Sequence, residues 1–128
     1  MINFDKNYFV EQEFSEKELG KYYESAKRDL RIAKKNKEPE VRFHFVYMAL
    51  IKIGIYHISK NGYRIKSRPG HHQAIIEYLS KILSNEDIKI IGDKMRKDRN
   101  LDLYSAGMGN TADEISMYVA FVDKIFKY

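Results

Sequence analysis

Hydrophobic residues recur at intervals of three and four along most of the chain, which is the spacing of amphipathic helices. Three helix starts are marked by capping boxes, in which an acidic residue follows a Ser or Thr by three positions: Ser15 with Glu18, Ser84 with Asp87 and Thr111 with Glu114. Glu38-Pro39 marks another start, because proline fits the first turn of a helix. The pattern predicts five helices, over about Ser15–Lys37, Pro39–Lys60, His71–Leu83, Asn85–Leu103 and Thr111–Phe126.

The predicted second helix, Pro39–Lys60, is apolar nearly all round, whereas the other helices carry a single apolar stripe. A helix of this kind is buried by neighbours on several sides or by a second subunit. The sequence has no internal repeat and no interdomain linker, so we expect one all-α helical bundle over residues 15–128. The aromatic-rich residues 1–14 are expected to form an N-terminal arm, and residues 59–70 a basic loop punctuated by glycine.

Length and composition narrow the class of protein. A chain of 128 residues is the size of one domain. It contains no cysteine, which excludes disulfides and thiolate metal sites. No uninterrupted apolar run reaches the length of a membrane span, and the first residues contain no signal-peptide core. We therefore expect a cytoplasmic protein that does not associate with a membrane.

The net charge of +5 is concentrated in one segment. Between Glu40 and Glu77 there is no acidic residue, and the rest of the chain holds 17 basic against 18 acidic residues. The segment contains all four histidines and six basic residues: Arg42, Lys52, Lys60, Arg64, Lys66 and Arg68. Such a segment is typical of a surface that binds a polyanion, and equally of a face that keeps the protein soluble.

The most informative polar group lies in the predicted fourth helix. Arg96, Arg99 and Asn100 are spaced to share one helix face, where arginine offers a planar fork for phosphate. The alternative is a solvated helix end. A metal or cofactor site is not expected, because His71 and His72 are adjacent and should point in different directions. His44 and His57 are too far apart to ligate together, and we expect both to be structural.

Four segments carry a resemblance to a known family. They are SAKRDLRIAKK in the first helix, the aromatic and small residues of the second helix up to Gly54, the Pro69-Gly70-His71-His72 turn, and Arg99-Asn100-x-x-x-Tyr104 before the last capped helix. In this order and spacing the chain resembles the HEPN domains (higher eukaryote and prokaryote nucleotide-binding) over about Ser15–Phe126. The resemblance implies an up-and-down bundle of four to five helices, commonly a homodimer, with no metal or other cofactor.

Active members of that family are metal-independent ribonucleases with an R-x4-H signature, and this chain has Tyr104 where the histidine belongs. Tyrosine ionises near pH 10, far above the working pH of a general base, whereas histidine at about 6.5 suits the role. Five residues also separate Arg99 and Tyr104 by about 140° on an ideal helix. The two side chains serve one site only if the helix ends between them or a dimer supplies the other half.

Three hypotheses follow from these patterns. The first is a weakly or non-catalytic HEPN protein that binds nucleotide or RNA, in a toxin–antitoxin pair or beside a nucleotidyltransferase partner. The second is a ribonuclease that uses Arg99, Asn100 and Tyr104, or a histidine such as His71 or His72 in place of the tyrosine. The third is a structural dimerisation partner. The residues expected to contact nucleic acid are Arg64, Lys66, Arg68, His71, His72 and Arg96.

Overall fold

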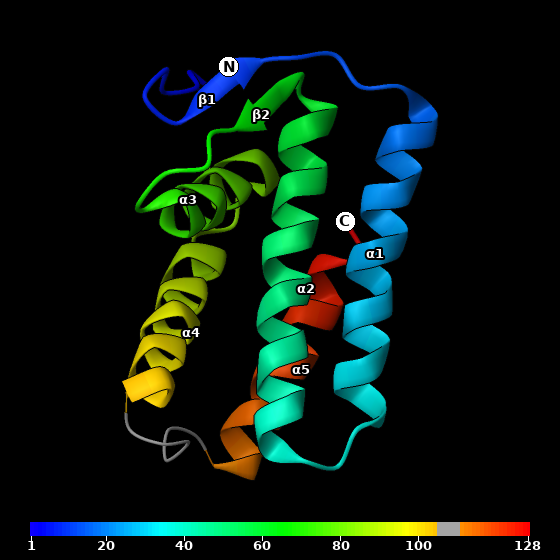
Figure 1. Cartoon of the computed structure of the whole chain (residues 1–128), viewed down its shortest axis with the longest axis vertical. Coiled ribbons are helices and arrows are strands. Elements are labelled where there is room, and N and C mark those ends of the chain that lie inside the picture. Colours follow the sequence, from blue (N-terminus) through cyan, green and yellow to red (C-terminus); the bar gives the residue numbers. More distant parts are fainter. Residues whose placement is uncertain (105–110) are drawn as a thin grey trace.

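The centre of the fold is helix α2 (Pro39–Lys60), which contacts all four other helices and one strand. The structure is a computed structural model that describes the backbone of residues 1–104 and 111–128 and the side chains of 1–101 and 111–128. The other helices in these ranges are α1 (Glu16–Lys35), α3 (His71–Leu83), α4 (Glu86–Tyr104) and α5 (Ala112–Ile125). Helices α1, α2, α4 and α5 run alternately down and up, and α3 lies at one end against α2 and α4 (Figure 1). The predicted all-α helical bundle is confirmed.

Local start signals account for most of the helix boundaries. Ser15 and Thr111 each form the complete capping box expected from the sequence, and Pro39 begins α2. The predicted box at Ser84 is wrong. Ser84 ends α3 in the left-handed region, at φ 52°, because the chain turns there directly into α4. The Asn85 side chain instead accepts the N–H of Asp87 at 3.0 Å.

The arm and the basic loop contain two short strands that the sequence pattern did not reveal. Strand β1 (Phe9–Glu11) pairs antiparallel with β2 (Tyr63–Ile65), so the N-terminus is fastened to the segment that precedes α3 (Figure 1). Phe4 and Phe9 are buried in the main core, and the Phe4 ring stacks on Tyr63 at 4.0 Å. This packing fixes the start of the loop that leads into α3.

Most of the apolar surface of α2 is covered by other parts of the same chain. Its buried side chains include Val46, Leu50 and Ile53, and the surrounding helices provide their neighbours. Of the described helices, only α2 is long and apolar enough to cross a membrane, and 56% of that window is buried inside the bundle. Several apolar side chains of this helix, among them Phe45 and Met48, are only partly buried by the rest of the chain.

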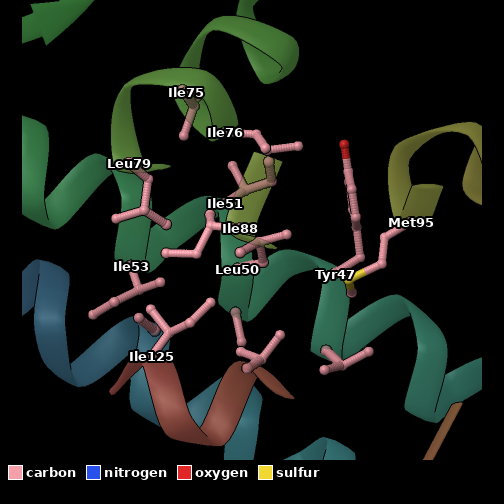
Figure 2. Close-up of a cluster of buried hydrophobic side chains, with 14 of the residues drawn as sticks. Tyr47, Leu50, Ile51, Ile53, Ile75, Ile76, Leu79, Ile88, Met95 and Ile125 are labelled. Carbon is pink, nitrogen blue, oxygen red and sulfur yellow. The ribbon is translucent and has the colours of Figure 1, made fainter. Parts of the chain in front are cut away.

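Helix α3 approaches its neighbours closely at two glycines. A Cβ atom placed on Gly54 of α2 would lie 2.5 Å from Ile75 Cγ2, and one on Gly92 of α4 would lie 2.6 Å from Ile76 Cγ2. Both isoleucines are buried in the cluster shown in Figure 2. The absence of side chains at Gly54 and Gly92 therefore sets how near α3 lies to both helices.

Alanine at these glycines tests the close approach. We expect Gly54→Ala and Gly92→Ala each to lower the free energy of unfolding by about 1–2 kcal/mol, because overpacking outweighs alanine's better helix propensity. Gly20→Ala in α1 is the matched control, since nothing lies within 4 Å of its added Cβ. It should raise the free energy of unfolding by up to about 1 kcal/mol. Urea denaturation measures all three, and equal effects at the three glycines would contradict the packing described.

Candidate functional site

A pocket of about 370 Å³ lies where the start of α3 meets the C-terminal half of α4. Its floor includes Tyr47 of α2, and its walls come from the loop before α3, the first turn of α3 and one face of α4. The described residues that line it are Tyr47, Ser67, Arg68, Pro69, Gly70, His71, His72, Gln73, Arg96, Arg99 and Asn100. The pocket thus combines three arginines and two histidines around one buried tyrosine.

Two of the three pocket arginines form no ion pair with a carboxylate of the described residues. The Arg99 guanidinium lies 5.3 Å from the centre of the Tyr47 ring, and within the described residues no carboxylate pairs with it. Arg68 donates to the carbonyl of Asn7 at 2.7 Å and lies over the Tyr8 ring. Arg96 is the exception, because its Nε lies 3.6 Å from an Asp93 carboxylate oxygen. Two of the three guanidinium charges therefore remain uncompensated.

The buried tyrosine fixes one of the histidines. Tyr47 OH and His72 Nδ1 are 2.9 Å apart, and the Tyr47 side chain is fully buried beside Met95 (Figure 2). No other partner for this hydroxyl is found among the described residues. A buried O–H needs an acceptor, so Tyr47 donates to Nδ1 and His72 carries its own proton on Nε2. This tautomer leaves an N–H donor available to a ligand.

Burial keeps both members of this pair uncharged at pH 7. Burial raises the pKa of Tyr47 to about 12, although the positive charges of Arg99 and Arg96 act against it. Burial is the largest of the causes that lower the pKa of His72 to about 4, and the positive charges of His71, Arg99 and Arg96 contribute to the same shift. His72 is therefore neutral at pH 7. Because its proton affinity is higher in the unfolded chain, this group reduces stability as the pH falls from about 6.5 to 4.

The first turn of α3 adds donors to the same wall. Gly70, at φ 84°, precedes the helix, and in the described structure no side chain caps this end. No acidic residue occupies the first turn of α3, so its positive helix end is not neutralised locally. His71 donates from Nδ1 to the carbonyl of Arg68 at 2.8 Å, which ties the loop to the helix. Such an end favours an anion when cationic side chains stand beside it.

Six of the residues predicted from the sequence meet in this pocket: Arg68, His71, His72, Arg96, Arg99 and Asn100. The ring centres of His71 and His72 are 4.5 Å apart, although His71 bonds to the Arg68 carbonyl and His72 to Tyr47. They share the pocket because α3 begins at His71 and its first turn faces α4.

The other predicted residues lie elsewhere. Arg64 donates to the side chain of Gln12, and Lys66 donates to the carbonyl of Lys6, so both fasten the loop to the arm. The side chain of Tyr104 lies outside the described residues. His44 is exposed, and His57 is buried, where burial lowers its pKa to about 4.

Sequence reasoning missed Tyr47, which sits in a helix that is apolar on nearly every side. A tyrosine hydroxyl at a buried helix position needs a hydrogen-bond partner, which is a signal for such a site. Nothing in the sequence indicates that this partner is residue 72. The described residues contain no group of three or more His, Asp or Glu side chains placed to hold a metal ion.

A second polar cluster joins α4 to α5 below the pocket. Lys94 donates to Tyr118 OH at 2.6 Å and to Asp98 at 2.9 Å, and Tyr118 donates to Asp98 at 2.6 Å. Every group in this cluster has a partner, and Glu114 completes it from the first turn of α5. It holds the two helices together and offers no free group to a ligand.

Comparisons with known proteins add no family or relative. No family model matches the chain, and no curated protein or solved structure shows significant similarity to it.

The charge of Arg99 acts on His72, and this coupling can be measured. We expect Arg99→Gln to raise the pKa of His72 above 4, because one of the positive charges that disfavours the imidazolium is removed. The pKa should stay below the ordinary value of about 6.5, since burial is the larger cause. NMR titration of the imidazole resonances gives the midpoint. Lys97→Gln is the control on the same helix and should leave it unchanged; an unchanged midpoint in Arg99→Gln as well would show that the two side chains are not neighbours.

Proposed function

We propose that this chain is a HEPN-like domain that binds nucleotide or RNA through the pocket between α3 and α4. The observation that supports this most strongly is the set of three arginines around a pocket with no carboxylate among its described lining residues. Guanidinium groups bind phosphate oxygens through paired, charge-assisted hydrogen bonds. The uncapped start of α3 and the N–H of His72 add donors of the same kind.

The ligand class follows from size and chemistry together. A pocket of about 370 Å³ lies at the lower end of the range for small-molecule sites, which suits one nucleotide unit. Asn100 supplies an amide at the rim that donates and accepts hydrogen bonds, as base or sugar groups require. Arg64 and Lys66 do not line the pocket, and we propose them as outer contacts for a longer RNA strand.

The proposal includes assembly and context. Following the HEPN resemblance, we propose a cytoplasmic homodimer, in a toxin–antitoxin pair or beside a nucleotidyltransferase partner. The dimer rests on the resemblance and on apolar side chains of α2, such as Phe45 and Met48, that its own chain covers only in part. A purely structural dimerisation partner is the reading that remains if the pocket binds no nucleotide and no RNA.

Substitution of the pocket arginines tests the proposal. We expect Arg99→Gln and Arg96→Gln each to weaken binding of a short single-stranded RNA by about 10–100-fold, which is the loss of about 1.5–3 kcal/mol from one charged contact. The slope of log affinity against log salt should flatten by about 0.7 for each phosphate contact removed. Fluorescence anisotropy at several salt concentrations measures both quantities.

The control for this experiment is Lys97→Gln, which removes the same charge from the exposed side of α4. If it weakens RNA binding as much as Arg99→Gln, binding depends on overall charge and not on the pocket. If the wild-type protein binds neither RNA nor nucleotide, the proposed function is wrong.

A ribonuclease is the second candidate, and one observation favours it: His72 stands in the pocket with Arg99 and Asn100, with its tautomer set by Tyr47. A histidine with a fixed tautomer next to cationic groups is a typical acid–base arrangement. We nevertheless expect cleavage of RNA in EDTA near pH 7 to be absent or very weak, because the signature position holds Tyr104 and His72 is hard to protonate. Strong cleavage that is lost in both Arg99→Ala and His72→Gln would establish the ribonuclease instead.

A further inference from the structure

The amount of positive charge in the pocket indicates which kind of phosphate group it binds. Arg68 and Arg99 have no carboxylate partner among the described residues, and only Arg96 is partly compensated, by Asp93 at 3.6 Å. The site therefore presents about two uncompensated positive charges. A phosphodiester inside an RNA strand carries one negative charge, whereas a phosphate monoester carries about 1.5 to 2 at pH 7.

His72 adds to the preference for the doubly charged phosphate monoester. The groups that face it are Tyr47 from α2, His71 from α3, and Arg96 and Arg99 from α4, so every charge beside it is positive or absent. Among the described residues, the one carboxylate near this group is Asp93, which lies 3.6 Å from Arg96 Nε and also acts on Tyr47, so it offsets part of the charge of Arg96. A bound anion offsets the field of the two arginines and makes protonation of His72 more favourable. A dianion does so more than a monoanion. The Nε2–H of His72 donates to a phosphate oxygen, while the proton added at Nδ1 donates to the Tyr47 hydroxyl oxygen.

The supply of donors also fits a terminal phosphate better than an internal one. A monoester has three terminal oxygens that accept hydrogen bonds, whereas a diester has two. The pocket offers guanidinium groups from the loop and from α4, His72 from α3, and the uncapped first turn of the same helix. These donors converge from three segments on one small space.

We propose that the pocket binds a terminal phosphate monoester, at the end of an RNA strand or on a nucleoside monophosphate, in preference to an internal phosphodiester. The inference rests on the proposed function and narrows its ligand. His72 and Arg99 distinguish the doubly charged end group from the singly charged strand.

The test compares RNA strands that differ only in one end group. The probes are one short single-stranded RNA with a 5′-phosphate, with a 3′-phosphate and with neither, together with AMP and adenosine. We expect at least one phosphorylated strand to bind about tenfold or more tightly than the unphosphorylated strand, and AMP to bind more tightly than adenosine. In Arg99→Gln and His72→Gln this preference should shrink to about threefold or less, while Lys97→Gln retains it.

The outcomes separate the two proposals. If the phosphorylated and unphosphorylated strands bind equally well, the preference for a terminal phosphate is wrong and the proposed RNA-binding function stands. If no probe binds, the proposed function itself fails. When the preference is found, AMP affinity similar to that of the phosphorylated strand identifies a free nucleotide as the ligand, and much weaker AMP binding identifies an RNA end.

An NMR titration of His72 gives a readout that a structural role would not produce. With saturating AMP, the midpoint of His72 should rise by about one pH unit or more, whereas adenosine should leave it unchanged. A midpoint that stays constant while AMP is bound would place the phosphate away from His72 and overturn the inference.

Discussion

The contact on which the rest of the site depends is the packing of α3 against two glycines. Ile75 meets α2 at Gly54 and Ile76 meets α4 at Gly92, each at a distance that a Cβ atom would obstruct. Because interiors are close-packed, this contact determines the position of α3 as a rigid unit. The same helix carries His71 and His72 in its first turn, so the packing of its apolar face sets where its polar end meets Tyr47 and the arginines of α4.

The pocket gathers positive charge that no carboxylate of the described residues fully neutralises. Arg68 and Arg99 both line the pocket without a carboxylate partner among these residues, and the half-buried His72 lies in the same pocket in its neutral form. Lys94, Asp98 and Tyr118, by contrast, pair with one another on the other side of α4. Unpaired charge that converges on one pocket is characteristic of sites that gain their partner from a ligand.

The sequence predicted much of this fold because its signals are local. Capping residues at Ser15 and Thr111, the proline that begins α2 and the three-and-four spacing of apolar side chains are readable without neighbours. The two strands could not be predicted, because three residues are too few to show a periodicity, and these strands form through the pairing of Phe9–Glu11 with Tyr63–Ile65. Ser84 was misread because the tight connection between α3 and α4 overrides a motif that is favourable only in an extended conformation.

For the site too, the residues that could be predicted are those grouped by local geometry, and the others depend on contacts distant in sequence. Arg96, Arg99 and Asn100 could be grouped because helix geometry alone places them on one face. The loop residues Arg64 and Arg68 could not be separated by sequence, since only the β1–β2 pairing directs Arg68 to the pocket and Arg64 towards Gln12. The role of Tyr47 could not be predicted, because it depends on the packing of α3, which brings His72 to its hydroxyl.

The most direct measurement is a map of ligand contacts on the intact protein, by ¹H–¹⁵N NMR titration with AMP. Binding at the pocket predicts that the largest shifts fall on the backbone amides of residues 70–73 and 96–100 and on the Arg96 and Arg99 side chains. The exposed basic face of α1, with Arg28, Arg31 and Lys35, provides the comparison on the same molecule. Shifts centred on that face, with none at the start of α3, would contradict the assignment of the pocket as the binding site.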